Sequence, residues 1–213
     1  MNPPDYFQVR FTYRQERKRI WAVLTEYLAD LFIPPTSVVL DAGAGYCDFI
    51  NQLKARERHA LDTSPIIQKY AAPSVVTHVG SCVKMADLTD NYFDIVFSSN
   101  LLEHLSRVES IETLNEIYRI LKDRGQLILI QPNFRICYKT YFDDYTHIQI
   151  FTDRSLSSLI ESIGFHLKYC APKFLPLSFD SKFPKSSWLL KLYLFLPFKP
   201  FAGQMLLVAK KKL

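Results

Sequence analysis

The stretch "VVLDAGAGYCDF", residues 38–49, runs from an apolar strand-like segment through an aspartate and two glycines into a predicted helix. The chain has only six glycines, and two of them, Gly43 and Gly45, lie here. Glycine lets the backbone turn tightly and lets a ligand lie against it, while the N–H groups that begin the next helix face that ligand. A lone G-x-G is also typical of a strand-to-helix turn without a ligand. The neighbouring segments must therefore decide between the two interpretations.

Strand-like apolar runs alternate with helical patterns along the rest of the chain. Strands are expected at residues 37–42, 58–62, 74–79, 92–99, 126–131, 165–170 and 204–210. Helices are expected at residues 13–32, 46–55, 64–72, 107–122 and 152–163. This alternation predicts an α/β fold with a doubly wound, seven-stranded, mostly parallel sheet and helices on both faces. Ligands of such sheets bind beyond the carboxyl ends of the strands, where Gly43 and Gly45 are expected.

The composition indicates one globular domain. A chain of 213 residues with 48% apolar residues can bury a single sizeable core, so residues 1–213 are expected to form one domain. We divide it into an N-terminal helical segment (1–36), a cofactor-binding core (37–170) and an apolar insertion before the last strand (171–203). The net charge of +5 comes mostly from scattered basic residues, which disfavours nucleic acid as a partner.

Targeting and metal signals are missing from the sequence pattern. The N-terminus lacks a signal-peptide pattern, and no apolar run reaches the ~20 residues that span a bilayer. The four cysteines form no C-x-x-C pair, so we expect a cytoplasmic protein with free thiols. The cysteines and the five histidines show no ligand spacing, which predicts no metal site.

The charges around the glycine turn indicate what kind of ligand it could hold. A dinucleotide site of the G-x-G-x-x-G type needs a small residue at position 48, and this chain has Asp48, which would repel a pyrophosphate. Asp41 adds a second negative charge beside the turn. These carboxylates suit a ligand with positive charge, such as S-adenosylmethionine, which carries an ammonium and a sulfonium and has no phosphate.

Four segments together resemble class I S-adenosylmethionine-dependent methyltransferases. "VVLDAGAGYCDFI" resembles the D-x-G-x-G motif of that family, "ALDTS" its second-strand acid, and "FDIVFSSNLLEHL" its fourth-strand motif. The run "LNEIYRILKDRGQLILIQPN" is similar to the helix, glycine turn and fifth strand that follow. The resemblance covers residues 37–170 and implies a Rossmann-like sheet whose last strand is antiparallel, with S-adenosyl-L-methionine as cofactor.

The resemblance also implies roles for single residues around the glycine turn. Gly43 and Gly45 would pack under the methionine and ribose portions of the cofactor, with Asp41 ordering that end. Asp62 would accept hydrogen bonds from both ribose hydroxyls, a task suited to a carboxylate. Thr63 would flank the adenine. From the residues alone, Asp62 could instead cap the helix that begins near residue 64.

The remaining cofactor positions follow the third and fourth strands. Asn100 would present its backbone carbonyl to the cofactor's ammonium, and Leu101 would line the same wall. Ser81 and Cys82 stand where the family often has an aspartate that reads the adenine amino group, so adenine recognition departs from the family pattern here.

The connection after the fifth strand is the expected acceptor site. In "YKTYFDDYTHIQIFTDRSL" (138–156), Asp143, Asp144, Tyr145 and His147 lie within five residues, and Thr152 is expected to cap the next helix. We predict that His147, with Asp144 beside it, lies within reach of the cofactor's methyl group as a proton acceptor or orienting group. A polar turn with an internally bonded His147 is the alternative. His104 is a second candidate, or a capping or packing residue.

The apolar insertion has three interpretations. Residues 183–201 include aromatic side chains beside lysines, so the segment could be a lid over the acceptor, an interface with another subunit, or a peripheral membrane contact. Its apolar residues run nearly all round rather than along one stripe, which favours ordinary packing or substrate covering.

The sequence thus predicts a methyltransferase that methylates an oxygen of a small-molecule or glycan-type acceptor. The lack of an N-P-P-Y-type tetrapeptide after the fourth strand disfavours base methylation. One alternative is an N- or C-methyltransferase acting on a lipid or quinone-like acceptor. The other is a non-catalytic protein that keeps the fold to bind a partner. The sequence pattern does not indicate an oligomeric state.

Overall fold

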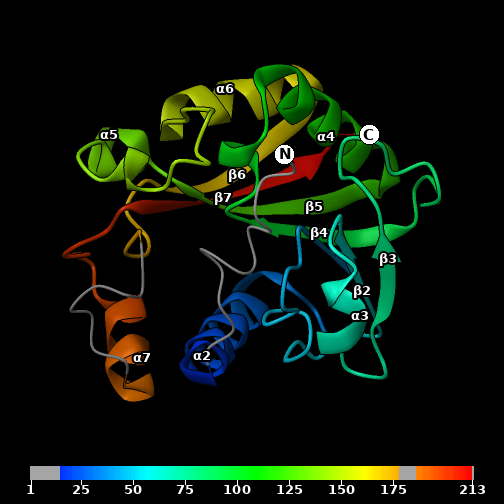
Figure 1. Ribbon diagram of the computed structural model, residues 1–213, viewed down its shortest axis with the longest axis horizontal. Helices are drawn as coiled ribbons and strands as arrows, with labels where there is room; N and C mark the ends of the chain where they lie inside the picture. Colours follow the sequence, from blue (N-terminus) through cyan, green and yellow to red (C-terminus); the bar gives the residue numbers. More distant parts are fainter. Residues whose placement is uncertain (1–14, 178–185, 213) are drawn as a thin grey trace, which may run out of the picture.

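The structure, a computed structural model, describes residues 15–177 and 186–212 and contains one seven-stranded sheet (Figure 1). The strands are β1 (Val38–Ala42), β2 (Glu57–Asp62), β3 (Val76–Val79), β4 (Phe93–Ser99), β5 (Leu121–Pro132), β6 (Phe165–Ala171) and β7 (Gln204–Lys211). Their order is β3-β2-β1-β4-β5-β7-β6. β1 to β5 pair in parallel, whereas β7 is antiparallel to both β5 and β6. The predicted fold class is confirmed.

Helices cover both faces of the sheet (Figure 1). They are α2 (Gln15–Phe32), α3 (Ile66–Tyr70), α4 (Arg107–Ile120), α5 (Phe134–Cys137), α6 (Asp153–Ile163) and α7 (Ser187–Phe195), with short 3₁₀ turns η1 (Leu102–His104) and η2 (Tyr141–Asp143). Thr152 caps α6 as predicted, because its side chain accepts from the Ser155 amide at 3.1 Å. None of the helices described here is long and apolar enough to cross a bilayer.

Two apolar cores lie on opposite faces of the sheet. Neighbouring strand residues point to opposite faces, so Val39 packs in the core beneath α2 and Leu40 in the core beneath α4 and α6. The central parallel strands β1 and β4 are buried on both sides, which explains their nearly continuous apolar sequence. This layered packing fixes the carboxyl ends of β1, β2 and β4 at one edge.

The helix expected over residues 46–55 is absent, and this prediction was wrong. The segment forms a series of turns, in which Cys47 has a φ of 58°. A left-handed residue two positions after Gly45 interrupts the α conformation. The idea that N–H groups of a following helix face the ligand therefore does not apply to this turn. The element ends also differ elsewhere: β5 begins at Leu121 rather than 126, and α3 is shorter than expected.

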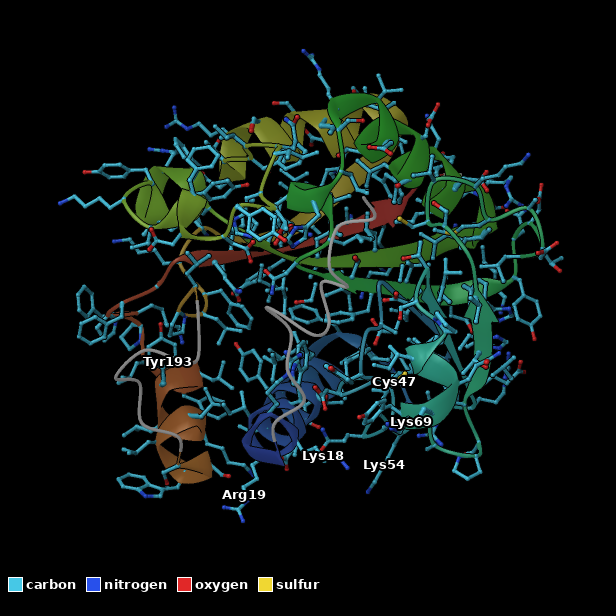
Figure 2. All side chains as sticks on the ribbon, in the orientation of Figure 1. Lys18, Arg19, Cys47, Lys54, Lys69 and Tyr193 are labelled. Carbon is cyan, nitrogen blue, oxygen red and sulfur yellow. The ribbon has the colours of Figure 1, made fainter. Side chains whose placement is uncertain are left out.

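The apolar insertion forms α7, which packs against α2. Leu190, Tyr193 and Leu194 are buried in the same core as α2, and Lys191 pairs with Glu26 at 2.7 Å. Lys199 closes the end of the helix by donating to the carbonyls of Tyr193 and Leu194 at 2.6 and 2.7 Å; Figure 2 shows Tyr193 on α7. These contacts agree with the packing interpretation. Residues 183–185 of the segment lie outside the described part, and peripheral membrane contact stays an untested alternative.

Candidate cofactor and acceptor site

The glycine turn follows the carboxyl end of β1. The strand order changes direction there, because β1 has β2 on one side and β4 on the other. Gly43 and Gly45 have φ values of 79° and 51°, which side-chain-bearing residues rarely adopt. The Gly43 amide donates to the Leu61 carbonyl at 2.8 Å, which holds the turn against the end of β2. A Cβ on Gly43 would lie 3.1 Å from Leu101 Cδ1, so glycine is needed for close approach as well. The fold thus brings Gly43 next to Leu101, two residues that the resemblance assigns to one site.

Asp62 closes the turn from the end of β2. Its Oδ2 accepts from the Gly45 amide at 2.9 Å, and its Oδ1 accepts from the Ser64 amide at 2.8 Å. Burial raises the pKa of Asp62, and these amides lower it again in part. Ser64 lies before α3, whose N-terminus has no side-chain cap, so Asp62 does not cap that helix. Each oxygen can still accept a further bond, so binding of ribose hydroxyls stays a prediction.

Three carboxyl groups surround the turn. Burial raises the pKa of Asp41 well above its ordinary value, with repulsion from Asp62 and Asp48 adding to the rise. Asp48 is also buried, and it pairs with Arg17 Nε of α2 at 3.0 Å. The charge of Asp48 is thus partly compensated by α2, which the sequence pattern did not indicate. A cationic ligand at the turn would relieve the remaining repulsion between Asp41 and Asp62.

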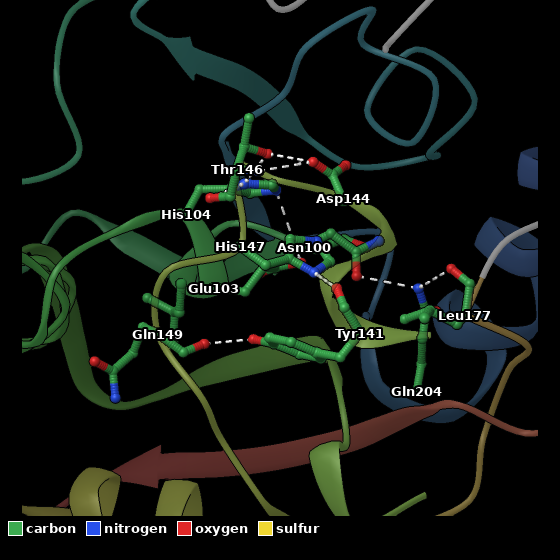
Figure 3. A network of polar contacts seen from close by, with 12 residues as sticks. Asn100, Glu103, His104, Tyr141, Asp144, Thr146, His147, Gln149, Leu177 and Gln204 are labelled. Atoms are coloured by element: carbon green, nitrogen blue, oxygen red, sulfur yellow. Dashed lines mark hydrogen bonds and ion pairs between the residues drawn. The ribbon is translucent and has the colours of Figure 1, made fainter. Parts of the chain in front are cut away.

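The structure places the other predicted cofactor residues in different environments. Asn100 follows β4 with a φ of 51°, and its Oδ1 accepts from Gln204 Nε2 of β7 at 3.0 Å (Figure 3). Thr63 is exposed beside Asp62. Ser81 Oγ accepts from the Val83 amide at 3.2 Å in a local turn.

Cys82 differs from the expectation in one respect. Its side chain is buried in the core beneath α4, and Thr113 Oγ1 donates to its Sγ at 3.6 Å. Burial raises the pKa of the Cys82 thiol. The side chain therefore points into the core, and a contact with adenine would have to come from the main chain of Cys82.

The two candidate histidines lie together although they are far apart in the sequence. Their ring centroids are 5.0 Å apart, with His104 on η1 and His147 on the loop after β5 (Figure 3). His147 Nδ1 lies 2.7 Å from the Tyr141 carbonyl, which can only accept, so Nδ1 carries the proton. The partner that sets the tautomer of His147 is thus a backbone carbonyl, whereas the sequence predicted Asp144.

Asp144 acts on His104 instead, through Thr146. Thr146 Oγ1 donates its single proton to Asp144 Oδ1 at 2.6 Å, and His104 Nδ1 lies 3.0 Å from the same Oγ1 and 3.3 Å from the Thr146 carbonyl. His104 Nδ1 must therefore donate to Thr146. Burial lowers the pKa of His104, and the neighbouring His147 lowers it further. The lone pair of each imidazole is left on Nε2.

Glu103 is a candidate site residue that the sequence analysis missed. Its side chain is 1% exposed, and neither carboxylate oxygen has a hydrogen-bond partner among the described residues. Burial raises the pKa of Glu103 to about 8, and the charge of Asp144 adds to the rise. The Glu103 carbonyl accepts from the amides of Ile148 and Gln149, which ties the loop after β5 to η1. The segment "LLEHL" contained the signal, since a carboxyl beside a candidate histidine warrants the same attention.

Comparison with known proteins supports the same family. A family model described as a methyltransferase domain matches residues 13–168. The uncharacterized protein MJ0638 of Methanocaldococcus jannaschii is 34% identical over 97 residues, which cover 45% of this chain and 41% of that protein. The match thus spans less than half the length of this curated relative.

Solved structures share the fold across nearly the whole chain. A SAM-dependent methyltransferase from Archaeoglobus fulgidus superimposes with a TM-score of 0.71 at 21% identity, over 97% of this chain and 99% of that one. The cyclase SpnF superimposes with a TM-score of 0.65 at 16% identity, over 90% and 81% of the two chains. At these identities the likeness establishes the fold alone.

Proposed function

Because the chain belongs to the methyltransferase domain family, whose class I members use S-adenosylmethionine, we propose that it transfers the methyl group of this cofactor to an oxygen of a small-molecule or glycan-type acceptor. In this reaction the acceptor oxygen attacks the methyl carbon, the carbon–sulfur bond breaks, and sulfur keeps the electron pair. S-adenosylhomocysteine is released, and the hydroxyl proton passes to a base or to water.

The connection between the glycine turn and the histidine loop carries this proposal. Gly43 lies against Leu101, η1 begins at the next residue, and the Glu103 carbonyl on η1 binds the amides of Ile148 and Gln149. This continuity supports the proposal that the loop with His147 lies beside the predicted methyl donor. Alignment of acceptor and sulfonium supplies most of the acceleration in such a transfer, and a base adds about a hundredfold.

The histidines supply groups that suit a hydroxyl acceptor. With Nδ1 bound to a carbonyl, His147 Nε2 can accept a proton or orient the acceptor, and Asp144 supports His104 through Thr146. This arrangement supports an acceptor that loses a proton on methylation, as a hydroxyl does.

A second candidate is transfer to nitrogen or carbon of a lipid or quinone-like acceptor. It is favoured by apolar side chains that stay exposed on and after α7, among them Trp188, Phe195 and Phe198. Such side chains often mark a contact with an apolar partner. The fold alone does not require methyl transfer, since the [4+2]-cyclase SpnF shares it, and partner binding without methyl transfer is the third possibility.

Release of S-adenosylhomocysteine over a panel of hydroxyl, amine and quinone acceptors tests the proposal. We expect turnover with a hydroxyl acceptor. The variant His147→Ala should keep its cofactor affinity and turn over about a hundredfold more slowly, whereas His166→Ala, an exposed histidine on β6, should match the wild type. Turnover restricted to amine or quinone acceptors would contradict the proposal, and so would cofactor binding without turnover on any acceptor.

A further inference from the structure

Glu103, His104 and His147 form a compact cluster of potential metal ligands. One ligand-type atom from each residue lies within 4.8 Å of the others, and His104 Nε2 is 4.0 Å from Glu103 Oε1. That distance is too long for a hydrogen bond. Three atoms with these separations share a centre at most about 2.8 Å from each, roughly 0.7 Å beyond the 2.0–2.2 Å at which imidazole and carboxylate groups bind zinc. Small side-chain shifts would close the site around an ion.

The burial of the Glu103 carboxyl group is the observation that points to a bound cation. Glu103 is 1% exposed, and both of its oxygens lack a hydrogen-bond partner within the described residues. A buried carboxyl group is protonated, paired or bound to a cation, because an uncompensated charge is costly. Opposite Glu103 lies His104 Nε2, which carries a lone pair because Nδ1 carries the proton. Two electron-pair donors thus face each other across 4.0 Å.

Both imidazoles are oriented as metal ligands are. His147 donates its Nδ1 proton to the Tyr141 carbonyl, and His104 donates its Nδ1 proton to Thr146, which is held in turn by Asp144. Metal-binding histidines usually donate their second ring N–H to a carbonyl or carboxylate, which fixes the tautomer and the ring. The Tyr141 hydroxyl donates to the Gln149 carbonyl, so the loop that carries His147 is itself braced.

We propose that Glu103, His104 and His147 bind one divalent transition-metal ion on the acceptor side of the cofactor site. Two imidazoles and a carboxylate suit Zn²⁺, Mn²⁺, Fe²⁺ or Co²⁺, whereas Mg²⁺ prefers oxygen ligands. Three protein ligands leave coordination positions open, as in catalytic zinc sites. The sequence predicted no metal, because the ligands come from two segments that only the fold brings together.

The site deepens the proposed function by giving the acceptor oxygen a place to bind. A bound ion would polarise a hydroxyl and lower its pKa, so that His104 and His147 would act as ligands and need not act as free bases. This step rests on the proposed transfer to oxygen. Metal binding itself can be measured without cofactor or acceptor, so a failure of the metal site and a failure of the proposed function are distinguishable.

Titration of the EDTA-treated full chain with Mn²⁺, Zn²⁺ and Mg²⁺ tests the site, by calorimetry and by elemental analysis of the dialysed protein. We expect one Mn²⁺ or Zn²⁺ per chain and at least tenfold weaker Mg²⁺ binding. Glu103→Gln and His147→Ala should each weaken Mn²⁺ or Zn²⁺ binding by at least about a hundredfold. Thr146→Val should weaken it about tenfold to a hundredfold through the orientation of His104.

The chain offers a matched control in a second histidine pair. His59 and His78 stack on β2 and β3, where His59 Nδ1 and His78 Nε2 bind each other at 3.0 Å. His78→Ala should therefore leave metal stoichiometry and affinity unchanged. Glu103→Gln nearly keeps the shape of the side chain, so it remains informative if His147→Ala fails to fold, and it should abolish the rise in melting temperature that Mn²⁺ gives the wild type.

The proposal is overturned if the wild type binds no Mn²⁺ or Zn²⁺ more tightly than about 1 mM. It is equally overturned if Glu103→Gln binds as the wild type does, or if His78→Ala removes the ion. The affinity for S-adenosylmethionine, measured in parallel, should be the same for the wild type and Glu103→Gln in the absence of metal. A loss of cofactor affinity in Glu103→Gln would assign Glu103 to the cofactor site and overturn the metal assignment.

Discussion

Asp62 carries two tasks at the scale of the single residue, because it closes the glycine turn and is the predicted acceptor for two ribose hydroxyls. Replacing it with alanine should weaken S-adenosylmethionine binding by about 2–3 kcal/mol, or roughly 30- to 150-fold, since hydrogen bonds to a charged acceptor are lost. Calorimetry measures this loss. As a control, Asp123→Ala removes a carboxylate near the beginning of β5, at the other edge of the sheet from the glycine turn, and should bind S-adenosylmethionine normally. An unchanged affinity in Asp62→Ala would remove Asp62 from the site.

The residues of the site were predictable to different degrees. Gly43, Gly45 and Asp62 follow strand ends in short local motifs, and the structure brings them together by backbone contacts to the Gly45 amide and the Leu61 carbonyl. For Glu103 the local segment shows only a carboxyl beside a candidate histidine, whereas its burial depends on a loop from far along the chain that folds back onto η1. Local sequence pattern predicts that a strand is followed by a glycine turn or an acid, and it carries no information on which loop covers that edge.

At the scale of elements, the His59–His78 pair joins β2 to β3. Burial lowers the pKa of both imidazoles, and repulsion from His59 lowers that of His78 further, although Glu57 opposes the shift at His59. The unfolded chain therefore binds more protons than the folded chain below pH 6.5. Stability should fall as pH drops from 6.5 through the lower folded-state pKa values, by up to about 1.4 kcal/mol per pH unit for each proton.

Urea unfolding of the wild type and of a His59→Gln, His78→Gln double variant between pH 7.5 and 5 checks this dependence. The double variant lacks both titrating groups, so its free energy of unfolding should fall less over this range. Parallel curves for the two proteins would show that carboxyl groups elsewhere dominate the pH response.

The packing of α7 against α2 leads to a separate prediction about the free energy of unfolding. Leu190 is 2% exposed in the core shared with α2, whereas Leu192, two residues further along the same helix, is 50% exposed. Leu190→Ala should lower the free energy of unfolding by about 2–4 kcal/mol, because it leaves a cavity. Leu192→Ala should change it by less than about 0.5 kcal/mol. Urea denaturation compares the two, and equal effects would show that α7 does not share the core in solution.

The element pattern was more predictable than the element ends. Every expected strand is present because apolar runs between turn residues are strong signals. The helix expected after the glycine turn failed because Cys47 takes a left-handed conformation, which the residue type does not indicate. α7 was not predicted as a helix, since its apolar residues run nearly all round and give no helical stripe. Packing against α2 decides its structure.

At the scale of the whole molecule, the strand order places the glycine turn and the loop after β5 at one edge of the sheet. Reversal of the strand order at β1 opens a site between β1 and β4, where ligands of doubly wound sheets bind. The same topology brings Glu103, His104 and His147 to that edge from two distant segments. The cofactor positions follow strand ends, whereas the cluster of Glu103, His104 and His147 depends on a loop that the fold brings back to η1.

This arrangement predicts selective stabilisation by sulfonium and thioether nucleosides over pyrophosphate cofactors. Asp41 and Asp62 flank the turn, and the turn lacks a following helix whose N–H groups would attract phosphate. S-adenosylmethionine and S-adenosylhomocysteine should therefore raise the melting temperature. At a ligand concentration of a hundred times the dissociation constant, the free energy of unfolding should increase by about 2.7 kcal/mol. NAD⁺ and NADP⁺ at the same concentration should leave it unchanged, because their pyrophosphate would meet the Asp41 and Asp62 carboxylates. Differential scanning calorimetry of the full chain measures both, and stabilisation by NAD⁺ would mean that the charge at the turn does not select the cofactor.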